Sequence, residues 1–336
     1  MTGDEGRGRD PAAPPLAQES GIGRVSVTQV PESGIGRASV TLSPDSSGPR
    51  SSPAPDSFGS LVFVPSMRPV PLFPGGVPID REARGVRVAI VDSGVEASHP
   101  WLERASIKHV KIEQRGESFG VVPGEPIDRS GHGTACAGII HRMAPGAELT
   151  SVCALNADGR CARDGLIAAL RYCVRERFTV VNLSLGIDIP RGAPLRPTDY
   201  KSLVELYEIA DAAYTAHVVL VASGPNVAGF RTYPGRFKSL IGVGRGSFSD
   251  AEAMQSHMTI DYEIIAPGND ILAPALGGGE RRWSGTSFAC PHVAAHVARI
   301  RAARPDLTTE SVKAALHELA ASRAPMPPPR SPDAAA

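Results

Sequence analysis

The sequence lacks an excess of charge of either sign and any long apolar run. Its 336 residues include 35 basic and 35 acidic side chains, without a block of like charges that would suit a nucleic acid. It contains no apolar stretch of about 18 residues, the length that a membrane span needs. The first residues, MTGDEGRGRD, are charged and lack the apolar centre of a signal peptide. We therefore expect neither nucleic acid nor a membrane as a partner, and a cytoplasmic location.

Cysteines are few, and their number is odd. The five lie at positions 136, 153, 161, 173 and 290. They have neither the density of a disulfide-stabilised domain nor the paired spacing of a structural zinc site. Free thiols in a reducing cytoplasm fit this pattern.

The first 80 residues are rich in proline, glycine and serine, and they contain a tandem repeat. The unit ESGIGRVSVTQVP at 19–31 returns as ESGIGRASVTLSP at 32–44, with 10 of 13 positions identical. Two copies of so short a unit cannot build a repeat fold, so we expect a mostly disordered tail over 1–80. A single globular domain is expected over 81–322, followed by a disordered Pro/Ala-rich tail over 323–336.

Within the globular part, short β-branched runs alternate with stretches of helical apolar spacing. The expected strands are 86–92, 149–155, 178–185, 217–223, 239–244 and 262–267, and the expected helices are 132–142, 162–176, 199–215, 287–303 and 308–321. Apolar strands separated by helices predict an α/β three-layer sandwich with a mostly parallel central sheet. In such folds the working residues gather at the carboxyl ends of the strands.

Three polar residues stand at positions that suit catalysis. Asp92 ends the first strand in AIVDSG, His132 lies in SGHGTACAG where a turn enters a helix, and Ser287 lies at a helix start in SGTSFACPH. Each alone has an ordinary structural explanation, as a turn residue, a helix-entry residue or a helix cap. Together they supply the hydroxyl, base and carboxylate that nucleophilic acyl transfer requires.

The motifs DSG, HGT and GTS-x-A, in this order, resemble those of the subtilisin-like serine peptidases, or subtilases. The resemblance covers roughly residues 82 to 320. It implies that Ser287 is the nucleophile, His132 the general base and then acid, and Asp92 the carboxylate that orients the histidine. The implied reaction is hydrolysis of peptide bonds by a serine endopeptidase through an acyl-enzyme. No cofactor is implied, and structural calcium is left open.

The resemblance also implies a cleft in which a peptide or protein substrate pairs as an added β-strand. The two walls would be formed by Ser184, Leu185 and Gly186 on one side and by Gly159, Arg160 and Cys161 on the other. Pocket residues are expected in 221–226 and 230–234, among them Ala222, Ser223, Gly224 and Thr232. These two segments contain no Asp or Glu, so we expect cleavage after neutral residues.

Two departures from the family pattern concern the reacting groups. The family's oxyanion asparagine follows a small residue and glycine directly, whereas here Pro225 comes first and Asn226 follows. We expect Asn226 to complete the oxyanion hole. Otherwise the Ser287 N–H acts alone, at a loss of about 10²- to 10³-fold in turnover. Cys136 resembles the cysteine of the thiol-containing branch that includes proteinase K and kexin, and a small buried apolar role is the alternative.

His292 and His296 are spaced four residues apart beside Cys290, a superficial likeness to a zinc-binding face. No third ligand is recognisable nearby, so we expect no metal there.

Three further interpretations concern biological role. The protein could be a dedicated maturation protease for a ribosomally made precursor peptide, or an inactive peptide-binding pseudoprotease, as Pro225 suggests. The apolar, proline-broken segment 61–74, LVFVPSMRPVPLFP, is expected to lie extended. Two roles are open for this segment: a passive linker, or an intramolecular inhibitor that occupies the cleft.

Overall fold

The computed structural model describes residues 24–26 and 71–323, so most of both predicted tails lies outside the described residues. The helices are α1 (His132–Met143), α2 (Arg163–Arg175), α3 (Pro197–Thr215), α4 (Thr286–Ala303) and α5 (Thr309–Arg323), with single 3-10 turns at Pro100–Leu102 and Leu276–Gly278. Each expected helix is present, with ends shifted by at most two residues. Within the described ranges, no helix combines the length and apolarity needed to cross a bilayer.

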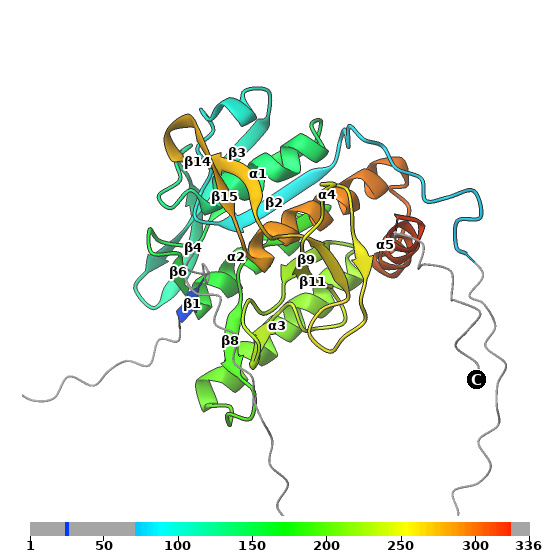
Figure 1. Ribbon diagram of the computed structural model, residues 1–336. Helices are drawn as coiled ribbons and strands as arrows, with labels where there is room; N and C mark the ends of the chain where they lie inside the picture. Colours follow the sequence, from blue (N-terminus) through cyan, green and yellow to red (C-terminus); the bar gives the residue numbers. More distant parts are fainter. Residues whose placement is uncertain (1–23, 27–70, 324–336) are drawn as a thin grey trace, which may run out of the picture.

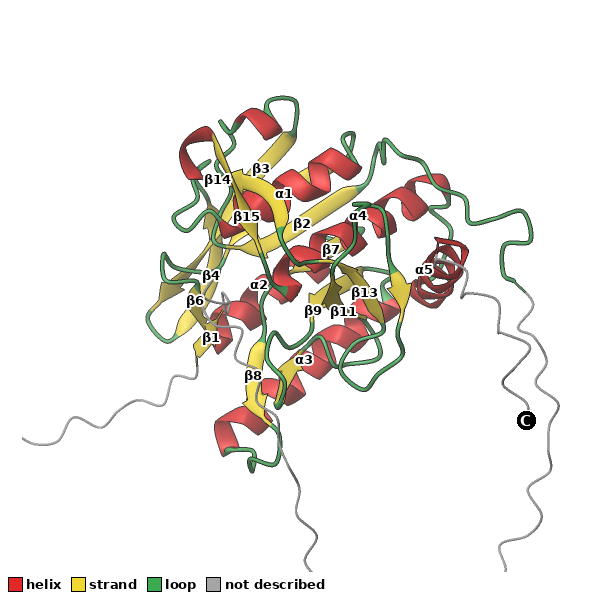
Figure 2. Ribbon diagram, in the orientation of Figure 1, coloured by secondary structure: helices red, strands yellow, loops and turns green. Residues whose placement is uncertain are grey.

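A nine-stranded sheet forms the middle of the molecule, in the order β12-β13-β11-β9-β7-β2-β5-β3-β4 (Figures 1 and 2). Its strands are β2 (Arg87–Asp92), β3 (Ser106–Arg115), β4 (Ser118–Pro123), β5 (Glu148–Cys153), β7 (Val180–Leu183), β9 (Val219–Ser223), β11 (Ile241–Gly246), β12 (Gln255–Ser256) and β13 (Ile264–Pro267). All neighbours from β13 to β3 run parallel, and the two outermost strands pair antiparallel. All six expected strands lie in this sheet, which confirms the predicted fold class.

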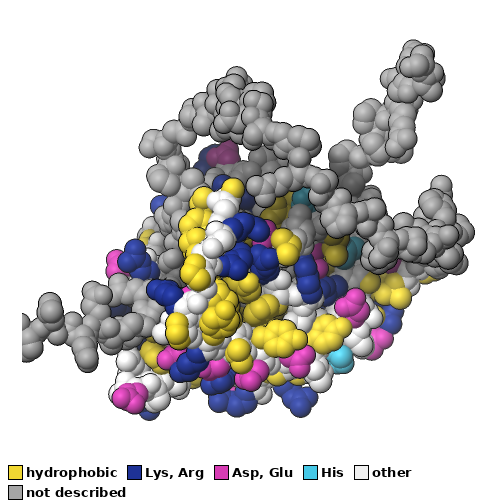
Figure 3. Space-filling model, turned by 90° about the horizontal axis from the view of Figure 1, so that it is seen from below, with side chains coloured by type: hydrophobic (Ala, Val, Ile, Leu, Met, Phe, Trp, Pro, Cys, Tyr) yellow, Lys and Arg dark blue, Asp and Glu magenta, His cyan; other side chains and the backbone are white. Residues whose placement is uncertain are grey.

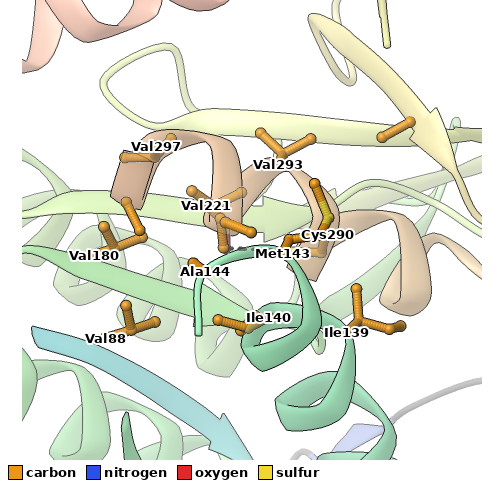
Figure 4. Packing of buried hydrophobic residues seen from close by; sticks show 14 of the residues in the cluster. Val88, Ile139, Ile140, Met143, Ala144, Val180, Val221, Cys290, Val293 and Val297 are labelled. Carbon is orange, nitrogen blue, oxygen red and sulfur yellow. Dashed lines mark hydrogen bonds between the residues drawn. The ribbon is translucent and has the colours of Figure 1, made fainter. Parts of the chain in front are cut away.

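Alternate residues of the central strands supply the two cores of the sandwich. In β2, Val88 and Ile90 belong to the core shared with α1, α4 and α5, whereas Ala89 and Val91 belong to the core shared with α2 and α3. This two-residue alternation is what a sheet covered on both faces requires. Figure 4 shows the first core, where side chains of α1 and α4 meet valines of the sheet.

Several short antiparallel pairs were not expected from the sequence. They comprise the β3–β4 hairpin, β8 (Ile187–Pro190) with β10 (Phe230–Tyr233), β14 (Ile271–Ala275) with β15 (Gly279–Trp283), and β1 (Arg24–Ser26) with β6 (Arg160–Ala162). The β3, β4 and β15 sequences carry few fully buried positions, so they lack the continuous apolar runs that marked the central strands.

The folded part begins before the expected boundary at residue 81. Phe73, Val77 and Ile79 pack against the first core, and the Asp80 N–H donates to the Arg299 carbonyl at 3.0 Å. Residues 61–70 of the predicted inhibitory segment lie outside the described residues. At its described end, the N–H groups of residues 72 and 73 donate to the Glu318 carboxylate on α5.

The fold predicts that Ile140, fully buried where α1 faces the sheet and α4, is important for stability. Ile140→Ala should lower the free energy of unfolding by about 2–5 kcal/mol, because it leaves a cavity in a packed core. Urea unfolding measures this, with Val204→Ala as control, because Val204 is 56% exposed on α3. A loss for Ile140→Ala no larger than that of the control would contradict the described packing.

Candidate active site

Asp92 lies at the carboxyl end of β2, at the centre of the parallel sheet, and is almost completely buried. Its Oδ1 accepts hydrogen bonds from the Ser93 backbone N–H at 2.7 Å and from the Ser93 hydroxyl at 3.2 Å. Two donors from the next residue therefore fix the carboxylate. Asp92 can therefore make this turn contact with Ser93 and also act in catalysis.

His132 is the first residue of α1, and its ring reaches the Asp92 carboxylate. The Nδ1 atom lies 2.8 Å from Oδ1 and 2.9 Å from Oδ2. The next residue, Gly133, permits this approach: a Cβ there would lie 2.1 Å from the Gly94 carbonyl oxygen. Because the carboxylate can only accept, Nδ1 carries the proton and Nε2 is left as the acceptor in the neutral ring.

Ser287 is the second residue of α4, and its backbone carbonyl has unusual partners. The carbonyl at this position of a helix normally accepts from the N–H four residues on, but residue 291 is proline and has no N–H. Instead, the Ser184 hydroxyl donates to the Ser287 carbonyl at 2.7 Å, and the Cys136 thiol lies 3.6 Å from it. Asn182 donates in turn to the Ser184 hydroxyl at 2.9 Å. The ends of β7, α1 and α4 thus meet at one buried oxygen.

The same contacts bring Ser287 beside His132. The Cys136 sulfur is 4.0 Å from His132 Nδ1, and the His132 ring lies 5.0 Å from the ring of Phe288, the residue after the serine. His132 Nε2 is buried and has no hydrogen-bond partner among the described residues. The Asp92 and His132 side chains are therefore paired, and the backbone of Ser287 lies near them. The Ser287 hydroxyl makes no hydrogen bond to His132 Nε2 in this structure.

Two opposing effects act on the pKa of His132. Burial disfavours the imidazolium, but the Asp92 carboxylate and the neighbouring Cys136 sulfur favour it, and the net result is that the pKa of His132 is raised well above 6.5. Burial raises the pKa of the Cys136 thiol to about 11. Cys136 is therefore a neutral thiol at physiological pH. It lies against the His132 ring but is not ionised to the thiolate, which is the nucleophilic form of cysteine.

Three residues with metal-ligand atoms cluster at this site, namely Asp92, His132 and Cys136. The histidines of the superficial zinc pattern are arranged differently: His292 Nδ1 donates to the Phe288 carbonyl at 2.8 Å, and burial lowers the pKa of His292 to about 4. The Cys290 thiol points to the Val221 carbonyl oxygen at 3.2 Å. Internal hydrogen bonds of α4 and β9 thus engage two of the three residues in that pattern.

Asn226 reaches the start of α4 despite the preceding Pro225. Its Oδ1 accepts from the Thr286 backbone N–H at 2.8 Å and lies 3.1 Å from the Thr286 hydroxyl. A backbone N–H can only donate, so the amide must present its oxygen there and its NH₂ elsewhere. Thr286 also donates through its hydroxyl to the Gly224 carbonyl at 2.9 Å. The amide of Asn226 is therefore tied one residue from Ser287.

Most side chains of the predicted 184–186 wall and of the pocket segment of β9 are buried. This group comprises Ser184, Leu185, Ala222 and Ser223. Gly186 lies against β10, where a Cβ would meet Thr232 Cγ2 at 2.6 Å. The side chains of these four residues therefore lie in the interior of the protein.

The residues predicted for the opposite wall lie in and beside a short strand outside the central sheet. Gly159 has φ +68°, a value that favours glycine, and its N–H donates to the Asn156 carbonyl at 3.0 Å in the turn that leads into β6. Arg160 and Cys161 form β6 with Ala162. Burial raises the pKa of the Cys161 thiol to about 12.

One acidic residue near the predicted pocket was missed by the sequence reasoning. The Thr232 hydroxyl donates to Asp188 Oδ1 at 2.6 Å, because β10 pairs with β8 in a register that sets these two residues opposite each other. Asp188 lies outside both inspected segments, and a pairing across 44 residues leaves no local signal. The Arg231 guanidinium donates to the carbonyls of residues 190 and 193 at the end of β8.

The chain is similar in sequence to known proteins. The family model "Subtilase family" matches residues 83–331. An intracellular serine protease of Paenibacillus polymyxa is 30% identical over 236 residues, which are 65% of this chain and 67% of that protein. Subtilisin BL of Lederbergia lenta is 31% identical over 250 residues, or 71% of this chain and 84% of its own length. Subtilisin NAT of Bacillus subtilis subsp. natto is 30% identical over 252 residues, with 60% of its length covered.

The similarity to these relatives shows that the chain is a serine-type endopeptidase, and its central, mostly parallel sheet is that of a three-layer α/β fold. The chain belongs to the subtilase family, which confirms the resemblance seen in its three motifs.

The geometry predicts the titration of two histidines in opposite directions. NMR titration should place the pKa of His132 above 6.5 and that of His292 below it. Asp92→Asn should lower the pKa of His132, because the charge that favours the imidazolium is lost, and leave His292 unchanged. An unmodified protein in which His132 titrates at or below 6.5 would contradict the described Asp92–His132 contact.

Proposed function

We propose that this chain hydrolyses peptide bonds with Asp92, His132 and Ser287 as its triad. The observation that carries the proposal is the buried Asp92–His132 pair beside Ser287, with His132 Nε2 left to accept a proton. The Ser287 oxygen attacks the substrate carbonyl carbon while its proton passes to Nε2. That proton then goes to the leaving amine as the C–N bond breaks, and water repeats the sequence to release the acyl group.

The negative charge on the substrate oxygen is stabilised by donors at the start of α4. We assign these to the Ser287 backbone N–H and to the NH₂ group of Asn226, whose oxygen is anchored on Thr286. The alternative of a pseudoprotease rested on Pro225, and the anchoring of Asn226 supports the active enzyme instead. Every reacting group comes from the chain, so the chemistry needs no cofactor. A structural calcium site is not part of the proposal.

Substrate peptide is proposed to lie between β6 and the 184–186 segment as an added strand, because β6 is an edge strand outside the central sheet. Figure 3 shows acidic, basic and hydrophobic side chains intermingled on the face that it draws. The intracellular serine protease among the relatives supports a cytoplasmic location. Trimming of a precursor peptide is one activity within this substrate class.

The segment 61–74 stays a predicted inhibitor of the cleft. Its described end lies on Glu318 of α5, which Figure 1 places on the opposite side of the molecule from β6. Removal of residues 1–76 would also remove the contacts of residues 72 and 73 with Glu318. Point substitutions within the segment therefore test its inhibition of the cleft more sharply than removal does.

Ser287 is expected to react with a fluorophosphonate probe, because the probe requires an activated serine hydroxyl. Mass spectrometry should locate the label on Ser287, and Ser287→Ala should abolish it. Ser284→Ala is the matched control and should label normally, since the Ser284 hydroxyl accepts from the Asp270 N–H outside the triad. A folded protein that never labels would rule out the proposed enzyme.

Asn226→Asp separates the two roles of the amide. It keeps an oxygen for Thr286 N–H but removes the NH₂ donor, so kcat should fall by at least about 10²-fold with little change in melting temperature. Steady-state kinetics and thermal unfolding measure both. A kcat close to that of the unmodified protein would mean that Ser287 N–H serves the oxyanion without Asn226.

Cleavage is expected after neutral residues. The acidic group beside Thr232, Asp188, is engaged by the Thr232 hydroxyl at the β8–β10 pair, and no acid occurs in 221–226 or 230–234. A peptide library read by mass spectrometry tests this preference. Dominance of Arg or Lys before the scissile bond would refute it, and loss of that dominance in Asp188→Asn would identify the missed counter-charge.

A further inference from the structure

A cavity of about 790 Å³ lies beside α1 and α4. It is bounded by α1, the loop between β11 and β12, the start of β14, and α4. Among the described residues that line it, none belongs to the triad or to either predicted wall of the peptide groove. Small-molecule sites commonly have volumes of about 300–1,000 Å³, so the cavity has the size of a ligand site.

Much of the lining is apolar and belongs to the protein interior. Ile139 and Met143 of α1 contribute to it and are each only 4% exposed. Phe248 and Ile271, which are partly buried, contribute further apolar surface. An apolar group that enters the cavity therefore leaves water, which is favourable.

Two of the three arginines that line the cavity are already paired. The Arg299 guanidinium donates to the Met143 carbonyl at 2.6 Å and to the Glu252 carboxylate at 3.0 Å. The Arg282 guanidinium lies 2.7 Å from the Asp270 carboxylate. Both acidic residues of the described lining are thus engaged by these two arginines.

The third arginine, Arg142 in the last turn of α1, has a different environment. Its Cζ lies over the Trp101 ring, 5.2 Å from the ring centroid, and it makes no ion pair with a described carboxylate. The Trp101 indole N–H donates to the Glu280 carboxylate at 2.6 Å, which fixes the ring. Stacking uses the face of a guanidinium and leaves the N–H donors in its plane available. Arg142 therefore offers the cavity one positive charge that no described acid compensates.

His292 gives the lining an uncharged polar group. The ring is 4% exposed and lines the cavity, and its Nδ1 is used by the Phe288 carbonyl. Burial lowers the pKa of His292 to about 4, so the imidazole is neutral at physiological pH. It therefore adds no charge for a second anionic group. The cavity combines one available cation with a neutral, largely apolar interior.

We propose that this cavity binds an apolar monocarboxylate, with the carboxylate on Arg142 and the apolar body against Ile139, Met143 and Ile271. Arg–carboxylate hydrogen bonds are charge-assisted and can be bidentate, which gives both strength and orientation. A dianion such as a phosphate monoester fits less well, because Glu252 and Asp270 also line the cavity. Since the triad lies outside the lining, this site does not depend on peptide hydrolysis.

Calorimetric titration with phenylbutyrate tests the site. All proteins carry Ser287→Ala to prevent self-digestion. Arg142→Gln should weaken binding at least about tenfold, because it removes the charge and the paired donors, and Arg142→Lys should recover part of the loss. Phenylbutyramide, which has the same apolar body without the charge, should bind the parent protein at least about tenfold more weakly than phenylbutyrate.

Arg175→Gln is the matched control. Arg175 is also an arginine in the last turn of a helix, and its Cζ lies 5.7 Å from the centroid of the Tyr172 ring, but it is outside the cavity. Its substitution should leave the affinity for phenylbutyrate unchanged. An equal loss in Arg175→Gln and Arg142→Gln would overturn the proposal, because it would show a general effect of surface charge.

NMR locates the bound probe. Phenylbutyrate should shift the ring signals of His292 and leave those of His217, which follows α3, in place. The same apolar carboxylate chemistry occurs at the end of a peptide, and N-acetyl-Gly-Phe tests that source. Binding of either acid that requires Arg142 supports the site, and the tighter of the two identifies the source. Failure of both acids to bind at millimolar concentration, or unchanged affinity in Arg142→Gln, would overturn it.

Discussion

One backbone oxygen, the carbonyl of Ser287, joins the elements on which the site depends. Pro291 removes the N–H that would satisfy this carbonyl within α4, and a buried carbonyl without a partner costs about 1–3 kcal/mol. The Ser184 hydroxyl at the end of β7 satisfies it, with the Cys136 thiol of α1 alongside. The need to pair one oxygen thus fixes where the helix that carries the serine meets the helix that carries His132.

Burial also shifts the pKa values of the titratable groups around this carbonyl. A histidine in a fully apolar site would stay neutral, as His292 does with its pKa lowered to about 4. His132 is equally buried, but the Asp92 carboxylate reverses the direction of the shift. The same environment keeps the Cys136 thiol protonated. A base that binds a proton readily therefore lies near Ser287, in a site where the Cys136 thiol is protonated, which favours chemistry at oxygen.

The sequence predicted the elements whose signal is local. Continuous apolar runs such as 86–92 and 217–223 predicted central strands. Asp92 ends the first of these strands, whereas His132 and Ser287 lie at the starts of α1 and α4. The missed features depend on pairing between distant segments. Asp188 meets Thr232 through the β8–β10 register, and Arg24–Ser26 meets β6 across more than a hundred residues. Asn226 was a candidate from the sequence, but its anchoring on Thr286 could not follow from a loop that contains Pro225.

A double-mutant cycle of Ser184→Ala and Pro291→Ala tests most directly whether the Ser287 carbonyl is the controlling contact. In Pro291→Ala the restored helical N–H can pair with this oxygen, so loss of the Ser184 hydroxyl should matter less. We expect a coupling free energy of about 0.5–3 kcal/mol in kcat/KM, with the double variant more active than the sum of the single effects predicts. Effects that add within about 0.3 kcal/mol would contradict it, because they would show that Ser184 acts on Ser287 by some route other than the unpaired carbonyl.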